Sequence, residues 1–136
     1  MKVKFFEKVQ SSQKPYVIAE LGSNHNGDMD LARELIVQAK SAGADCVKFQ
    51  SWSKESIFSK VKYEDNCFVN DDYRGRTDYT LEKIVQKFAI SEDDLATMIN
   101  FANELEMDCT STPFSPSEAE FLVGHDVPFF KIASMD

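Results

Sequence analysis

The chain alternates short apolar runs with segments in which apolar residues recur at helical spacing. Short apolar runs that end at turn-forming residues are typical of the buried strands of a parallel sheet. Such runs predict strands over residues 16–21, 45–50, 107–112 and 128–134. Spacing of three and four predicts helices within residues 31–42, 79–88, 95–105 and 116–124. The hydrophobic pattern therefore predicts the order β-α-β-α-α-β-α-β.

Capping residues support these helix boundaries. Asp28 and Asp30 precede the first helix, and Gly43 follows it, as is usual at a helix end. Residues 91–94 have the form of a capping box, and residues 115–118 combine a cap with a proline at the first helical position. Residues 51–77 are polar with little periodicity, which favours a long loop over much of that segment.

Alternation of strands and helices implies parallel strands joined by right-handed crossovers. We expect one sheet with its strands ordered one to four and its helices on one face. The predicted fold class is an α/β parallel (β/α)-barrel of the TIM type, and such a barrel needs about 250 residues and eight strands. The chain, residues 1–136, would then be the N-terminal portion of the barrel domain and cover about the first four β/α units.

Composition and charge narrow the functional classes. The formal net charge of −8 argues against a nucleic-acid partner, which needs a basic face. No apolar run is long enough to span a bilayer, and residues 1–10 lack the features of a signal peptide, so we expect a cytoplasmic protein without a membrane partner. The three cysteines form no CxxC pair and are expected to be free thiols, with Cys46 and Cys109 packed as small hydrophobes.

Ligands of parallel α/β folds bind at the carboxyl ends of the strands, and polar residues collect at all four predicted ends. The first strand ends with Glu20, Asn24 and His25, the second with Lys48 and Gln50, the third with Ser111 and Thr112, and the fourth with Lys131 and Ser134. A charge in an apolar strand is costly unless it is paired or binds something. Lys48 alone could simply pair with Glu20, but two such lysines favour a ligand with a phosphate and a carboxylate.

The two histidines are weaker candidates. His25 lies between two asparagines in a glycine-bounded loop and could be a hydrogen-bonding loop residue or a catalytic group. His125 precedes the fourth predicted strand and is interpreted as a surface residue at the opposite end of the barrel. The sequence has no P-loop, no GxGxxG motif and no cluster of metal ligands, so no metal-binding residue is predicted in this chain.

Four segments resemble motifs of the sialic acid (N-acetylneuraminate) synthase family. They are IAELGSNHNG at residues 18–27, AGADCVKFQ at 42–50, STPF at 111–114 and FKIAS at 130–134. Each motif alone is a weak signal, but the four occur in the order of the family and together span most of the chain. We therefore interpret the chain as similar to the N-terminal half of the barrel domain of such a synthase.

The resemblance implies a condensation of phosphoenolpyruvate with an N-acylated amino-sugar aldehyde, such as N-acetylmannosamine. By motif position, Lys48, Gln50, Lys131 and Ser134 would hold phosphoenolpyruvate, with Ser111 and Thr112 nearby and Asn24 and His25 lining the site. Glu20 would act as a base or charge stabiliser close to the reacting carbons. The family also implies a Mn²⁺ or Mg²⁺ ion held by histidines beyond this chain, a C-terminal antifreeze-like domain and a homodimer.

Two other functions stay open at the level of sequence. The chain could belong to another phosphate-binding barrel enzyme, either a phosphosugar acid synthase or an aldolase that forms a Schiff base on Lys48 or Lys131. It could instead be a non-catalytic half-barrel that persists by self-association, because its sheet would have two open edges.

Overall fold

Three parallel strands form the sheet of this protein in a computed structural model, which describes residues 3–57 and 81–134. The strands are β1 (Ile18–Gly22), β2 (Cys46–Ser51) and β3 (Asp108–Pro113), in the order β1-β2-β3. Both neighbouring pairs are parallel. The prediction of parallel strands in sequence order is confirmed for these three, whose connections are long enough to return the chain to the same end of the sheet.

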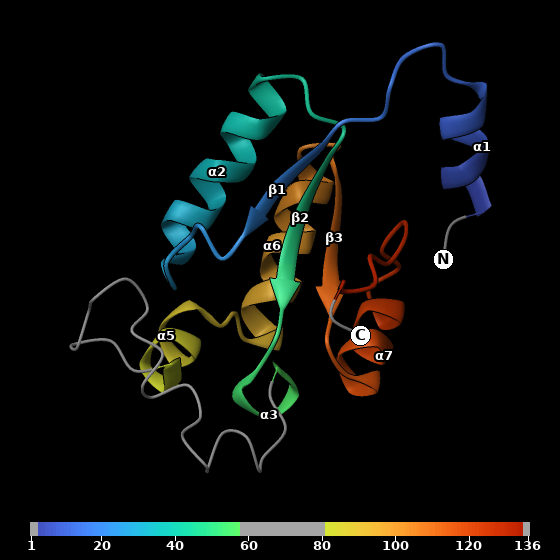
Figure 1. The fold of residues 1–136 in the computed structure, drawn as a ribbon. Helices are drawn as coiled ribbons and strands as arrows, with labels where there is room; N and C mark the ends of the chain where they lie inside the picture. Colours follow the sequence, from blue (N-terminus) through green and yellow to red (C-terminus); the bar gives the residue numbers. More distant parts are fainter. Residues whose placement is uncertain (1–2, 58–80, 135–136) are drawn as a thin grey trace.

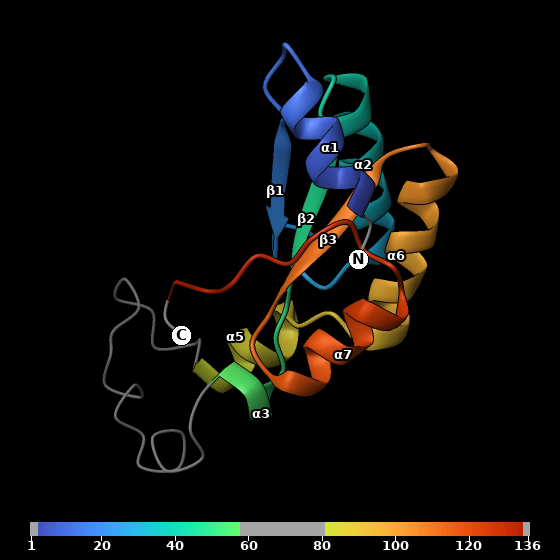
Figure 2. The same ribbon diagram turned by 90° about the vertical axis from the view of Figure 1, so that its right-hand side faces the viewer.

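Helices α2 (Met29–Ser41), α6 (Glu92–Glu104) and α7 (Pro116–Gly124) cover one face of the sheet (Figure 2). Three further helices lie at its two ends. Helix α1 (Val3–Ser11) is at the N-terminal end of the strands, whereas α3 (Lys54–Ile57) and α5 (Leu81–Phe88) are near their carboxyl ends (Figure 1). No helix within residues 3–57 and 81–134 is long and apolar enough to cross a membrane. The face opposite α2, α6 and α7 is called the open face below.

The predicted caps start the three helices that cover the sheet. Asp28 accepts hydrogen bonds from the backbone N–H groups of Asp30 and Leu31. Ser91 accepts from Asp94 N, and Ser115 accepts from Glu118 N, with Pro116 at the first turn. Each cap satisfies a backbone donor that the first helical turn leaves unpaired. The sequence motifs therefore placed these helix starts correctly.

The core lies between the sheet and its three covering helices. Because side chains alternate along a strand, Val47 and Phe49 of β2 point to the helices, where they are fully buried with Ile36 and Leu95. Lys48, between them in sequence, must then point to the open face. The register aligns Glu20 with Lys48 on the open face and Val47 with Cys109 on the helix side. The charged side chains of the strands therefore lie on the open face, and the helix side is mostly apolar.

The cysteines behave as predicted where the structure describes them. Cys46 and Cys109 are buried free thiols. Burial is the main cause that raises the pKa of the Cys109 thiol, which keeps it protonated and unreactive. Cys67 lies outside the described residues. The two buried cysteines therefore serve as small core residues.

Two helices were not predicted from the hydrophobic pattern. Helix α1 packs through Phe5 on Tyr16 and Phe129, with ring centroids 5.1 and 4.6 Å apart, so tertiary contact and not periodicity defines its place. Helix α3 lies within the segment predicted as a long loop, residues 51–77. The remainder of that segment, from residue 58, is outside the described residues.

The prediction of a fourth strand at residues 128–134 is wrong for this structure. The segment crosses past β3 from the helix side to the open face without forming a strand (Figure 2). The Thr110 hydroxyl donates to the Phe129 carbonyl, a side-chain bond that stands where a strand would have a backbone ladder. Lys131 and Ile132 are exposed, the latter by 67%. An apolar strand of a parallel sheet is stabilised by neighbours on both sides, and only β3 is available among the described residues.

The contact between the β1–α2 loop and α5 gives a test of this packing. Gly27 has a φ of +77°, and a Cβ added there would lie 2.3 Å from the carbonyl oxygen of Lys87. Gly43 also has a positive φ, +86°, but a Cβ there meets nothing within 4 Å. We expect Gly43→Ala to lower the free energy of unfolding by about 1 kcal/mol and Gly27→Ala by at least about 2 kcal/mol, since only the latter adds a backbone clash.

Urea unfolding of both variants, followed by circular dichroism, measures the difference. Equal losses for the two alanines would show that the loop does not pack on α5.

Candidate active site

Side chains from all three strands meet on the open face of the sheet. The Lys48 ammonium of β2 forms an ion pair with the Glu20 carboxylate of β1, and it donates a hydrogen bond of 3.3 Å to Thr112 Oγ1 of β3. Glu20 and Lys48 are aligned in the sheet register, and Thr112 is aligned with Gln50 two positions further along. These three residues, which we call the strand-end cluster, are brought together as the sequence predicted.

Exposure differs sharply across the strand-end cluster. Lys48 is 7% exposed, whereas the side chain of Glu20 is 51% exposed. A buried ammonium needs a compensating partner, but a half-exposed carboxylate keeps much of its hydration and can exchange its partner for water. The pair therefore satisfies Lys48 while leaving its charge within reach of an anion that enters from the open face.

Gln50 and the end of β1 complete the floor of this region. The register slips between Glu20 and Gly22, as at a β-bulge, and Gly22 has a φ of +53°. A Cβ on Gly22 would lie 3.6 Å from Glu20 Oε1 and 3.7 Å from Gln50 Oε1. The bulge thus brings both polar side chains against the backbone of Gly22. Bulges often re-aim side chains beside active sites.

The loop after β1 separates the two other candidates of the first strand end. Asn24 is exposed, but His25 is completely buried, and its ring lies 6.1 Å from that of Phe49 on the helix side. His25 Nδ1 accepts a hydrogen bond of 3.0 Å from Gly27 N, so Nε2 carries the proton. Nε2 has no hydrogen-bond partner among the residues that the structure describes. His25 therefore shapes the loop and does not face the strand-end cluster.

Ser111 lies on the opposite side of the sheet from Lys48. It is aligned with Phe49, so its side chain points to the helices, where its hydroxyl donates to Ser51 Oγ at 2.9 Å. Ser51 Oγ in turn donates to the Thr112 carbonyl oxygen at 3.3 Å. The sequence placed Ser111 and Thr112 together because they are adjacent, but strand alternation puts their side chains on different faces.

Lys131 and Ser134 follow α7 in the segment that is not a strand, and both are exposed. The structure therefore does not bring them into the strand-end cluster. Thr110, which was not predicted, is aligned with Lys48 and holds Phe129 at the start of that segment. Thr110 lies two residues before Thr112, so strand alternation places both side chains on the same face. This spacing could have identified Thr110 from the sequence as a residue of the open face.

The described residues do not fit a metal site. Residues 3–57 and 81–134 contain no group of three or more His, Cys, Asp or Glu side chains that could hold a metal ion. One nitrogen of His25 is engaged by Gly27, and Nδ1 of His125 lies 2.9 Å from the Phe121 carbonyl oxygen. Neither histidine is therefore placed as a ligand within the strand-end cluster.

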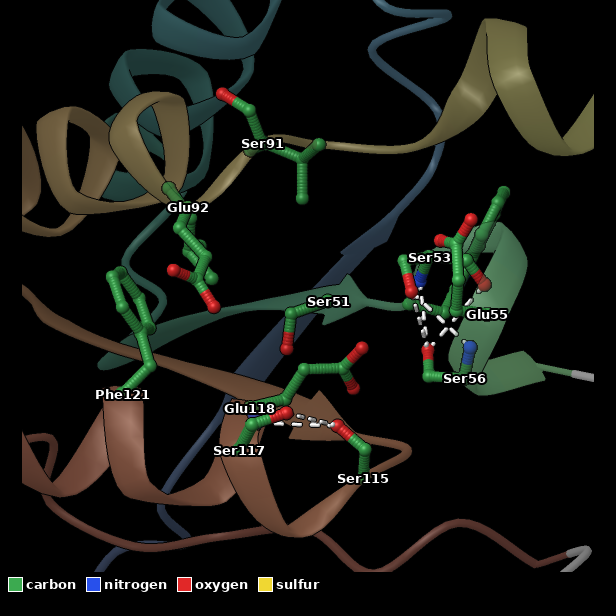
Figure 3. Close-up of a pocket in the computed structure, with 13 residues that line it drawn as sticks. Ser51, Ser53, Glu55, Ser56, Ser91, Glu92, Ser115, Ser117, Glu118 and Phe121 are labelled. Carbon is green, nitrogen blue, oxygen red and sulfur yellow. Dashed lines mark hydrogen bonds between the residues drawn. The ribbon is translucent and has the colours of Figure 1, made fainter.

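A pocket of about 520 Å³ opens on the helix side of the sheet, between α3 and the first turns of α6 and α7 (Figure 3). Three carboxylates line it, those of Glu55, Glu92 and Glu118, together with several serines and Trp52. Carboxylates repel anions, so this pocket is unsuited to a phosphate or a carboxylate ligand. The strand-end cluster, with its lysine, is the better anion site.

The fold and the strand-end cluster define an α/β protein with parallel strands and a polar site at their carboxyl ends. The chain belongs to the NeuB family, whose family model matches residues 35–136.

Several curated relatives of the chain are sugar acid synthases. It is 36% identical over 124 residues to the N,N'-diacetyllegionaminic acid synthase of Legionella pneumophila, covering 91% of this chain and 34% of that protein. It is 36% identical over 121 residues to the human N-acetylneuraminate-9-phosphate synthase, covering 89% and 33%. The pseudaminic acid synthase of Helicobacter pylori is 32% identical over 124 residues, with 91% and 36% covered. The chain therefore spans about a third of the length of these relatives.

Solved structures agree with this assignment. The N-acetylneuraminic acid synthetase of Leptospira borgpetersenii, determined with citrate, has a TM-score of 0.69 at 26% identity and covers 89% of this chain and 36% of its own. A spore coat polysaccharide biosynthesis protein of Bacillus subtilis has a TM-score of 0.63 at 28% identity and covers 90% and 30%.

The buried His25 makes stability depend on pH. Burial lowers the pKa of His25 from its ordinary value of 6.5, and the negative charge of Asp94 only partly opposes this shift. As the pH falls below 6.5, the unfolded chain takes up a proton on His25 before the folded protein does. The contribution of neutral His25 to the free energy of unfolding is therefore fully present above pH 6.5 and is lost as the pH falls toward the pKa of the folded state. We expect the free energy of unfolding to fall between pH 7.5 and pH 5.5, and His25→Asn to flatten that slope.

Denaturant unfolding at four pH values gives both slopes. His125→Asn is the control, because it removes a histidine that is only partly buried. If His25→Asn leaves the slope unchanged, His25 is not the group that titrates.

Proposed function

We propose that the full-length protein that carries this chain joins phosphoenolpyruvate to an N-acylated amino-sugar aldehyde, such as N-acetylmannosamine, to give a sialic acid-type α-keto sugar acid and phosphate. Sialic, legionaminic and pseudaminic acid synthases among its relatives support this class of reaction. Residues 1–136 would supply about the first four β/α units of a TIM-type barrel. The observation that carries the proposal is the strand-end cluster, in which a buried lysine faces the open side of the sheet beside a carboxylate and a hydroxyl.

Phosphoenolpyruvate carries a phosphate and a carboxylate, and both need positive charge. In the proposed complex Lys48 exchanges part of its pairing with Glu20 for the incoming anion, and Thr112 keeps the ammonium in place. The segment that carries Lys131 and Ser134 crosses to the same side of the sheet, which supports their sharing the ligand within a complete barrel (Figure 2). Gln50 lies beside Glu20 and would contact the same ligand.

The proposed reaction has two bond-forming steps. The terminal alkene carbon of phosphoenolpyruvate attacks the aldehyde carbon, whose oxygen takes up a proton, and water adds to the carbon that bears the phosphate. Phosphate then leaves with cleavage of the C–O bond, which leaves the α-keto acid. Glu20, released from Lys48 by the anion, would accept the proton of the attacking water or stabilise positive charge that develops beside it. Exposed Asn24 would line the aldehyde side of the site.

The remaining parts of the proposal come from the likeness to sialic acid synthases. They are a Mn²⁺ or Mg²⁺ ion and a homodimer. A cytoplasmic location is proposed from the sequence itself, in keeping with the free thiols Cys46 and Cys109. No described residue group fits the metal ion, so no step above depends on it. The substrates proposed as partners are phosphoenolpyruvate and the amino-sugar aldehyde, without nucleic acid.

Removal of the two lysines tests the binding role. We expect Lys48→Ala and Lys131→Ala in the full-length protein each to lower kcat/KM for phosphoenolpyruvate at least about tenfold, because each leaves ligand charge unpaired in a partly desolvated site. Lys14→Ala, an exposed lysine beyond the other end of β1, is the matched control and should change kcat/KM less than about twofold. A loss below about twofold for either lysine would remove that residue from the assignment.

Borohydride reduction in the presence of substrate tests the competing aldolase reading. The proposed condensation forms no imine, so no stable adduct should appear on Lys48 by mass spectrometry. A reduced Schiff base there would overturn the condensation in favour of the aldolase reaction.

Residues 1–136 alone should not turn over phosphoenolpyruvate. The chain corresponds to about a third of the N,N'-diacetyllegionaminic acid synthase of Legionella, 34% of its length, so most of a complete site would be missing. Phosphate release is measured with phosphoenolpyruvate, N-acetylmannosamine and Mn²⁺. A rate of about 1 per second or faster would contradict the expectation.

A further inference from the structure

Two buried hydroxyls lie directly behind the strand-end cluster, on the helix side of the sheet. Ser51 ends β2, and Ser111 lies within β3, opposite Phe49 in the register. Both are buried. Hydroxyls at positions where the strand faces an apolar core are costly unless they form hydrogen bonds.

The two serines form a chain of hydrogen bonds that reaches the active-site strand. The Ser111 hydroxyl donates to Ser51 Oγ at 2.9 Å, and Ser51 Oγ donates to the carbonyl oxygen of Thr112 at 3.3 Å. On the opposite face, Thr112 Oγ1 accepts from Lys48 Nζ at 3.3 Å. Thr112 is therefore held from both sides, through its backbone by the serines and through its side chain by the lysine.

The two serines lie close to the carboxyl end of the β2–β3 ladder. Ser51 is the last residue of β2 and is aligned with Pro113, the last residue of β3. The hydroxyl of Ser51 therefore adds a side-chain hydrogen bond between the two strands at the point where their ladder ends.

We propose that Ser51 and Ser111 are positioning residues that fix Thr112, and through it the Lys48 ammonium, for binding of phosphoenolpyruvate. The inference rests on the proposed function. It gives Ser111 a role on the helix side of the sheet, in place of the position beside the ligand that its motif implied. Neither serine touches the open face, so both act only through Thr112.

Kinetics of the full-length protein test the proposal. Ser51→Ala and Ser111→Ala should each lower kcat/KM for phosphoenolpyruvate about tenfold, through misplacement of the lysine. Ser51→Thr keeps the hydroxyl on a residue suited to strands, so it should restore most of the activity. Ser117→Ala is the matched control, because Ser117 and Ser51 both line the pocket on the helix side of the sheet. Among the described residues, the Ser117 hydroxyl forms a hydrogen bond only with that of Ser115. This variant should stay within about twofold of the parent protein.

A double-mutant cycle separates positioning from general stability. Thr112→Val removes the hydroxyl that contacts Lys48 and keeps the shape of the side chain. If the serines act through that hydroxyl, Ser51→Ala should cost less than about twofold in the Thr112→Val background. An equal loss in both backgrounds, or a loss as large for Ser117→Ala, would overturn the proposal. Should Ser51→Ala fail to fold, the same cycle is run with Ser111→Ala, which leaves Ser51 in place.

A measurement that needs no turnover distinguishes this proposal from the proposed function. The rate of reductive methylation of Lys48, followed by mass spectrometry, reports how firmly its ammonium is held. This rate should rise about threefold or more in Ser51→Ala and Ser111→Ala, a change of the size expected from the loss of one hydrogen bond. It should stay unchanged in Ser51→Thr and Ser117→Ala. An unchanged rate in the alanine variants would overturn the positioning role. A protein that shows these rate changes but never turns over phosphoenolpyruvate would refute only the proposed function.

Discussion

A single buried ammonium constrains the polar side of this sheet. Lys48 occupies the central strand between Val47 and Phe49, two residues that anchor the core. Strand alternation leaves its side chain no direction except the open face, and its low exposure requires partners within reach. Glu20 and Thr112 supply them from the two flanking strands. The register, the bulge and the strand order therefore all help to place partners around the Lys48 ammonium. A shift of one residue in β1 or β3 would leave this ammonium unpaired.

Much of this arrangement follows from sequence patterns whose physical causes are local. Apolar runs predicted β1, β2 and β3, and the caps at Asp28, Ser91 and Ser115 predicted where the long helices begin. A cap depends only on residues within one turn, so the sequence contains all that decides it. The meeting of Glu20 and Lys48 also followed, because parallel strands bring their carboxyl ends to one edge of the sheet.

The features that the sequence did not predict correctly depend on tertiary contacts. The apolar run at 128–134 reads as a strand, yet pairing depends on neighbours that the described residues do not contain. Helix α1 is positioned by aromatic contacts of Phe5 with residues distant in sequence. His25 looked like a site residue because it sits among polar neighbours, whereas the turn of its loop directs the ring toward Phe49. Ser111 was grouped with Thr112 by adjacency, and only the register of β3 against β2 shows that the two face opposite ways.

The two faces of the sheet are usually treated as separate, one for stability and one for chemistry. At the carboxyl ends of β2 and β3 this separation fails, because the backbone of Thr112 belongs to both faces at once. Its carbonyl is held from the helix side and its hydroxyl holds Lys48 on the open side. Both strands end within one residue of Thr112, and the hydroxyls of Ser51 and Ser111 add hydrogen bonds there to those of the backbone ladder. Strand alternation places these two hydroxyls on the helix side, and the same alternation directs Lys48 to the open face.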